Sequence, residues 1–200
     1  MILLALVLAA CGSGPGSAAV PDPVGSPASS SQTTAAGPAS LDGRLDAIDG
    51  AITRWQAATE LSAAHAAAEE ARNLIVGPAG PSYGDADGDR TVGGASDAGL
   101  LPGLEGQPGV AADTDGPCVA RDVLGGSWAE PAARWATLDE AIQAWSPSNN
   151  TFPALPSHPQ RIVGWSTLTL ATDDLATALE YGGHARLHID ISRNAATDCR

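Results

Sequence analysis

The chain has 200 residues, of which 44% are hydrophobic and 16% charged, and its formal net charge is −13. It contains no lysine, which excludes functions that depend on a lysine Schiff base or on the lysine of a P-loop. The acidic balance, without a basic patch, argues against nucleic-acid binding, because phosphate contacts need clusters of arginine and lysine.

The first ten residues form an apolar run that is too short to span a bilayer. The run is typical of the hydrophobic region of a secretory signal. Its end, Leu8-Ala9-Ala10-Cys11, resembles the lipobox of bacterial lipoproteins, which implies removal of residues 1–10 and lipidation of Cys11. No basic segment precedes the run. The alternatives are an ordinary signal peptide cut near Ala10, or an apolar N-terminus with a chance cysteine.

Residues 12–40 are rich in Gly, Ser, Ala, Pro and Thr and contain no aromatic residue. Such a segment cannot bury enough apolar surface to offset the entropy of ordering it. We therefore expect residues 11–40 to be a lipidated cysteine followed by a disordered tether. An anchor followed by a spacer predicts a domain held at the cell membrane, on its extracytoplasmic face.

Apolar residues recur at helical spacing from Leu41 to Val76, with one shift in register after Trp55. Ser40 is a suitable N-cap, and Gly77-Pro78 is a typical helix end. This pattern predicts a long helix with one buried face.

Further helices are expected over residues 117–124, 127–145 and from Thr172 to about Arg193, with a loop over residues 146–160. The stretch from Ile162 to Leu170 fits either a short strand or the start of a helix. The Gly182-Gly183 pair either kinks the last helix or allows close packing. Together these patterns predict a single all-α domain at residues 41–200, a bundle of three or four helices with a long irregular acidic loop at residues 77–116.

Within that loop, Asp85, Asp87 and Asp89 alternate around Gly88. The pattern resembles the calcium loops of EF-hand and dockerin-type sites, in which carboxylates at the first, third and fifth positions converge on the ion. The resemblance implies a calcium site formed by Asp85, Asp87, Asp89, the backbone carbonyl of Thr91 and Asp97. Arg90 stands at the sixth position, where glycine is usual, and Asp97 lies one residue after the twelfth position, which is Ser96. The alternative is a solvated Asp/Gly turn without metal.

Cys118 and Cys199 remain once Cys11 is lipidated, and an even pair outside the cytoplasm predicts a disulfide. Two unpaired thiols are the alternative. His184 and His188 lie four residues apart, hence on one helical face, and His65 is a possible third ligand for a transition metal. Ordinary hydrogen-bonded histidines are the alternative, and His158, among prolines, is expected in the loop.

The sequence lacks the motifs Gly-x-Ser-x-Gly and His-Glu-x-x-His. It therefore favours a non-enzymatic, lipid-anchored calcium-binding protein that acts as a binding or interaction module for a protein or small molecule whose identity is unknown. A helical bundle that handles a transition metal or haem through the three histidines is the rival hypothesis. An enzyme with a carboxylate site in the acidic loop is a third.

Overall fold

The computed structural model describes residues 40–114, 116–148 and 155–198, all of which belong to one compact unit. The predictions on Cys11, on the tether up to residue 39 and on Cys199 concern residues outside these ranges. The described residues form α-helices joined by irregular segments, so the all-α prediction is confirmed. The α-helices are α1 (Leu41–Gln56), α2 (Leu61–Val76), α3 (Pro131–Gln143), α4 (His158–Ala171) and α5 (Leu175–Asp198), and two short elements are a 3-10 helix, η1 (Val110–Asp113), and a π-helical turn, η2 (Val119–Val123).

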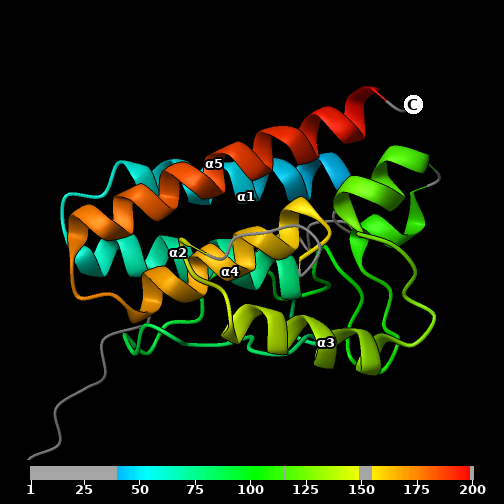
Figure 1. Ribbon diagram of the computed structural model, residues 1–200, viewed down its shortest axis with the longest axis horizontal. Coiled ribbons are helices and arrows are strands. Elements are labelled where there is room, and N and C mark those ends of the chain that lie inside the picture. The colour runs from blue at the N-terminus through cyan, green and yellow to red at the C-terminus, as the bar shows by residue number, and fades with distance from the viewer. Residues whose placement is uncertain (1–39, 115, 149–154, 199–200) are drawn as a thin grey trace, which may run out of the picture. The chain divides into compact units, whose positions relative to one another are not determined.

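Four of these helices form an antiparallel bundle. Helix α1 packs against α2 and α5, and α4 packs against the same two helices from the other side. The chain direction alternates around the ring, because α1 and α4 run one way and α2 and α5 the other (Figure 1). Helix α3 packs against α4, outside the four-helix ring. Among the described residues, no helix is both long enough and apolar enough to cross a membrane.

The prediction of one helix from Leu41 to Val76 is wrong, because the chain turns back on itself between α1 and α2. Helix α1 ends with hydrogen bonds from the amides of Ala57 and Ala58 to carbonyls of its last turn. The backbone of Glu60 is extended, with φ of −137°. The shift in register after Trp55 therefore marks a turn between two antiparallel helices, each of which buries its own apolar stripe. Residues 162–170, whose pattern was ambiguous, belong to helix α4.

The glycine pair in α5 allows close packing and does not interrupt the helix, which is continuous from Leu175 to Asp198. The buried indole of Trp55 lies against Gly182, where an added Cβ would approach its ring to 3.1 Å. The Trp55 Nε1 donates a hydrogen bond of 2.8 Å to the carbonyl of Ala178, one turn earlier in α5. Gly182 therefore determines how closely α1 and α5 approach.

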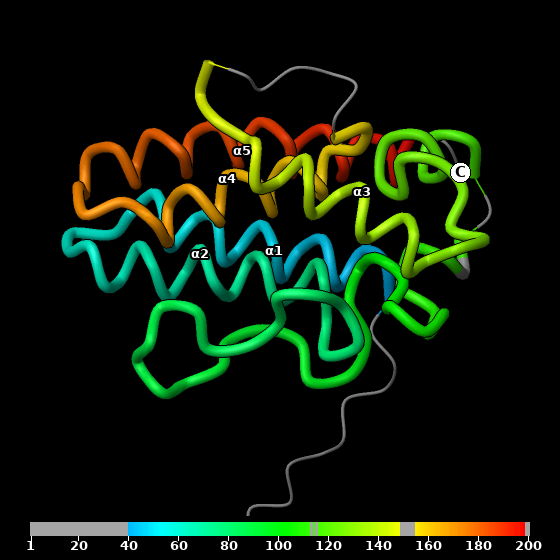
Figure 2. The backbone as a smooth tube through the Cα atoms, turned by 60° about the horizontal axis from the view of Figure 1, so that its bottom comes forward, coloured from blue at the N-terminus to red at the C-terminus, as the bar shows by residue number. Residues whose placement is uncertain are grey.

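The segment after α2 is irregular, as expected, and it lies beside that helix (Figure 2). Leu100 and Leu101 are fully buried, and their amides donate to the last carbonyls of α2, at Leu74 and Ile75, over 3.0 Å each. Carbonyls at a helix C-terminus lack partners within the helix, so the returning segment satisfies them. The loop is thus attached to α2 by buried side chains as well as by hydrogen bonds.

Candidate acidic site between helix α2 and the loop

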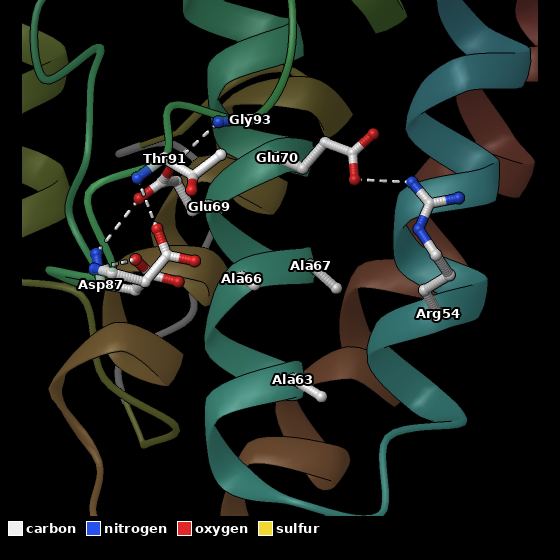
Figure 3. A pocket seen from close by; sticks show the side chains of 10 residues that line it. Arg54, Ala63, Ala66, Ala67, Glu69, Glu70, Asp87, Thr91 and Gly93 are labelled. Carbon is white, nitrogen blue, oxygen red and sulfur yellow. Dashed lines mark hydrogen bonds and ion pairs between the residues drawn. The ribbon is translucent and has the colours of Figure 1, made fainter. Parts of the chain in front are cut away.

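Glu69 of α2 is the centre of the loop attachment. This residue is only 2% exposed. Both of its carboxylate oxygens accept hydrogen bonds from the loop backbone. Oε2 accepts a hydrogen bond of 2.5 Å from the amide of Ala86. It also accepts one of 3.1 Å from the amide of Asp87, and Oε1 accepts one of 3.1 Å from the amide of Gly93; Figure 3 draws these two donors beside Glu69. Bonds from amides to an ionised acceptor are among the stronger hydrogen bonds in proteins. Glu69 therefore shapes the loop from the helix side.

Asn73, one turn further along α2, forms a second attachment. Its amide nitrogen donates to the carbonyls of Gly84 at 3.1 Å and Gly93 at 2.8 Å, and its amide oxygen accepts from the Gly84 amide at 3.3 Å. Glu69 and Asn73 are four residues apart and hence on one face of the helix. Two adjacent turns of α2 thus hold both ends of the segment from Gly84 to Gly93.

The aspartates of the loop fold it through local hydrogen bonds. Asp85 accepts from the amides of Gly88 at 2.8 Å and Arg90 at 2.9 Å. Asp87 accepts from the amide of Asp89 at 3.0 Å, and Asp89 accepts from that of Thr91 at 2.6 Å. Such turns are the usual local behaviour of aspartate. They curl the backbone of the loop between Asp85 and Thr91.

Arg90 shows how the loop accommodates a departure from the calcium-loop pattern. Its φ is +73°, in the left-handed region that usually needs glycine. Position six of a calcium loop requires a sharp turn, and Arg90 makes that turn although it carries a side chain. The backbone therefore turns at Arg90 without a glycine.

Three carboxylates meet where the loop crosses α2. Glu69, Asp85 and Asp87 each present an oxygen, and these atoms all lie within 4.8 Å of one another. Desolvation raises the pKa of the Asp87 carboxyl, and the charges of Glu69, Asp89 and Asp85 add to the effect. The buried guanidinium of Arg72 lies close enough to Glu69 to feel its charge. The negative charges at the cluster thus outnumber the one guanidinium that acts on Glu69, and a bound cation would reduce this excess.

Asp97 does not join this cluster. Its Oδ1 accepts a hydrogen bond of 2.7 Å from the guanidinium of Arg44 in α1, a side chain that is 4% exposed. This bond holds the pKa of the Asp97 carboxyl below its ordinary value. The structure therefore assigns Asp97 to a buried arginine, and it brings Glu69 into the place beside Asp85 and Asp87.

A groove of about 380 Å³ runs alongside the acidic cluster (Figure 3). One side is formed by alanines of α2, and the Arg54–Glu70 ion pair, 2.6 Å long, links α1 to α2 at one end. Asp87, Asp89 and Thr91 line the loop side of the groove. The alanines of α2 that form this side, called the alanine floor below, are Ala63, Ala66 and Ala67.

The predicted histidine site is not assembled. His65 Nε2 lies 3.1 Å from the carbonyl of Thr172, and His184 stacks on Trp165 with ring centroids 4.3 Å apart. His188 pairs with His158, which is the first residue of α4 and not a loop residue. Within the described ranges, Glu69, Asp85 and Asp87 form the one group of three or more potential metal ligands.

Cys118 is disulfide-bonded, and its partner lies outside the described residues. Cys118 lies one residue before η2, at the start of the short helical segment expected from residue 117. The pairing with Cys199 remains a prediction, since Cys11 and Cys199 are both outside the described ranges.

Sequence reasoning did not find Glu69 or Asn73, although one signal was available. Both are polar residues in a helix whose sequence is mostly alanine and other apolar residues, and both are buried in the structure. Polar side chains at buried helix positions require partners, and a neighbouring loop rich in free amides supplies them. Comparison of the chain with protein families, with curated proteins and with solved structures gave no significant match, so the interpretation of this site rests on its own residues.

Proposed function

We propose that the domain is a calcium-binding module, anchored by a lipid on Cys11 to the extracytoplasmic face of the membrane, in which the ion joins the acidic loop to helix α2. The observation that supports the proposal is the convergence of Glu69, Asp85 and Asp87 oxygens within 4.8 Å. Oxygen ligands from carboxylates suit a hard cation such as calcium better than a transition metal.

The hydrogen bonds of the loop also favour binding. Asp87 and Asp89 each use one carboxylate oxygen for a backbone amide, and among the described residues no donor reaches the other oxygen of either side chain. The loop is held by Glu69 and Asn73 through protein contacts, so an ion would find ligands already in place. Binding to a preformed site costs less ordering entropy than binding to a disordered chain.

The groove beside the cluster supports a non-enzymatic binding role. Its alanine floor is apolar, and its loop wall includes Asp87 and Asp89. An ion bound at the cluster would fix that wall and reduce its negative charge. We therefore propose that calcium controls the shape of a surface that binds a partner outside the cytoplasm.

The test is calcium titration of the full chain after chelation, by calorimetry and by thermal unfolding. For extracytoplasmic sites with a Kd of about 10⁻⁴ to 10⁻³ M, millimolar calcium stabilises by about 0.4–1.4 kcal/mol. For a domain of this size this corresponds to a rise in Tm of about 1–5 °C. Magnesium is expected to give a smaller response, because it demands a tighter octahedral geometry.

The matched variants are Asp85→Asn/Asp87→Asn and, as a control with the same change in charge, Asp173→Asn/Glu180→Gln at exposed positions outside the loop. The first pair is expected to abolish the calcium response, and the second to retain it. If wild-type protein binds no calcium, or if the control pair loses the response equally, the acidic loop is only a folded turn and the proposal fails.

A further inference from the structure

A second group of potential ligands lies on the α4–α5 side of the bundle. His158 begins α4 and His188 lies in α5, and their Nδ1 atoms are 3.0 Å apart. The ring centroids are 5.3 Å apart, with the planes tilted by 40°. Both side chains are half-buried. The two Nδ1 atoms, on different helices, thus lie within hydrogen-bonding distance of each other.

The surroundings disfavour a positive charge on either ring. Burial lowers the pKa of His188 to about 3, and a positive charge on His158, Arg161 or His184 acts in the same direction. Burial and Arg161 also lower the pKa of His158, against the opposing effect of the Asp122 carboxylate. A neutral imidazole offers a lone pair, which is the form that binds a metal.

We propose that His158 and His188 form a binding site for a borderline transition metal ion, with Cu²⁺ preferred, through their two Nδ1 atoms. At a metal–nitrogen distance of about 2.0–2.1 Å, two nitrogens 3.0 Å apart subtend roughly 95° at the ion. That angle matches adjacent positions of a square-planar or octahedral site and is smaller than the tetrahedral angle that zinc prefers. Water molecules complete the coordination.

Metal binding would not change the number of protons on the histidine pair. Without metal, one Nδ1–H donates to the other Nδ1. When the ion binds, the ring that carried this proton changes tautomer and holds it on Nε2, so both ligands remain neutral and no proton is released from the pair. The charge of Asp122, which acts on His158, favours a divalent ion nearby, whereas the charge of Arg161, which acts on both rings, opposes it.

This site is independent of the proposed calcium site, because its ligands are nitrogens on other helices. The experiment uses the full chain without an affinity tag, in millimolar calcium so that the acidic loop is occupied by the harder ion. Cu²⁺ is titrated by calorimetry at neutral pH, and the bound ion is examined by electron paramagnetic resonance. The expected result is one Cu²⁺ per chain with hyperfine coupling to two imidazole nitrogens.

Four variants assign the ligands. His158→Gln and His188→Gln are each expected to weaken Cu²⁺ binding at least about 100-fold, since losing even an outer-shell partner of a metal commonly costs 10- to 100-fold. His65→Gln and His184→Gln serve as controls and are expected to bind as wild type does. If one ligand variant does not fold, as judged by circular dichroism, the other variant and the nitrogen count of wild type still decide.

The proposal is overturned if wild-type Cu²⁺ shows no pair of coordinated nitrogens, or if both ligand variants bind as wild type does. It is also overturned if His65→Gln or His184→Gln removes the binding. If the calcium proposal fails in its own test, the nitrogen count of wild type still decides, because the carboxylates of the acidic loop contribute no coordinated nitrogen.

Discussion

Glu69 and Glu70 are neighbours in α2 whose surroundings differ completely. Glu69 is buried and accepts backbone amides of the loop, whereas Glu70 pairs with Arg54 near the surface. A buried acceptor that loses its partners leaves several amides unsatisfied, while an exposed ion pair contributes little. The same change of side chain at these two positions therefore separates the structural role of Glu69 from general charge effects.

We predict that Glu69→Gln lowers the free energy of unfolding by about 2–3 kcal/mol, because an NH₂ group replaces one acceptor oxygen and faces amide donors. Glu70→Gln is expected to cost less than about 1 kcal/mol. Urea unfolding of both variants in chelator measures the difference without any contribution from calcium. Equal, small losses in the two variants would show that the Glu69 contacts do not hold the loop.

The Asp97–Arg44 pair predicts a specific dependence on pH. Arg44 lowers the folded-state pKa of Asp97 below 3.8, so the pair stabilises fully above the unfolded pKa and its contribution is lost as pH falls through the lower folded value. At neutral pH, Asp97→Asn is expected to cost about 1–2 kcal/mol, less than for a fully buried pair, because Asp97 is half-exposed.

The measurement is urea unfolding of wild type and Asp97→Asn from neutral pH to about pH 2.5. The stability difference between the two is expected to be constant above about pH 5 and to shrink below about pH 4. A difference that stays constant through the acid range would contradict the assignment of Asp97 to Arg44.

The roles of Glu69 and Asp97 could not be predicted because both depend on tertiary contacts. The spacing of Asp85, Asp87 and Asp89 is local, and two of these carboxylates lie in the cluster with Glu69. Asp97 is paired with Arg44, 53 positions earlier in the chain. Glu69 lies on helix α2, outside the calcium-loop pattern. A local pattern can indicate the turn, whereas the other residues that join the cluster depend on how the loop packs against α2.

At the scale of the helices, apolar periodicity predicted the elements well and their connections poorly. The stripes of α1 and α2 were both recognised, but the turn at residues 57–60 contains no proline or glycine to mark it. The start of α4 at His158 was missed because prolines surround it, although Pro159 is well tolerated in the first turn of a helix. Helix ends depend on packing partners that periodicity does not reveal.

The two glycines of α5 give a matched test of helix packing. An added Cβ at Gly182 would meet the Trp55 ring at 3.1 Å, whereas one at Gly183 would meet nothing within 4 Å. Gly183→Ala is therefore expected to stabilise by about 0.5–1 kcal/mol through helix propensity. Gly182→Ala is expected to lose about 1–3 kcal/mol to overpacking, which outweighs the same gain.

Thermal unfolding of the two variants, with tryptophan fluorescence to follow the environment of the indoles, distinguishes them. Opposite shifts in Tm are expected. If both variants gained stability, Gly182 would have no role in the approach of α1 and α5.

At the scale of the whole molecule, the four-helix ring supplies most of the buried core and the acidic loop supplies most of the candidate site. Helix α2 belongs to both, because one face packs in the bundle and Glu69 and Asn73 hold the loop. The net charge of −13 opposes compaction through self-repulsion, and a bound cation relieves part of it. Calcium is therefore expected to stabilise the loop far more than the four-helix ring.

The predictions of the lipid anchor and of the disulfide depend on each other, because the chain has three cysteines. Cys118 is disulfide-bonded, and a cysteine whose sulfur carries a lipid cannot also form a disulfide. If Cys11 is lipidated, Cys199 is the remaining cysteine within the chain. We therefore predict a Cys118–Cys199 bond in protein isolated from membranes, closing a loop of about 80 residues that stabilises by roughly 4–5 kcal/mol.

Non-reducing peptide mapping of the membrane fraction tests both features together. The expected products are a lipid-modified peptide that begins at Cys11 and a linked pair that contains Cys118 and Cys199. Cys11→Ser is expected to release the protein from membranes or block signal removal while leaving that linked pair intact. A Cys11–Cys118 linked peptide in wild type would contradict the lipid anchor, because the same sulfur would be in the disulfide, and free thiols at Cys118 and Cys199 would contradict the bridge alone.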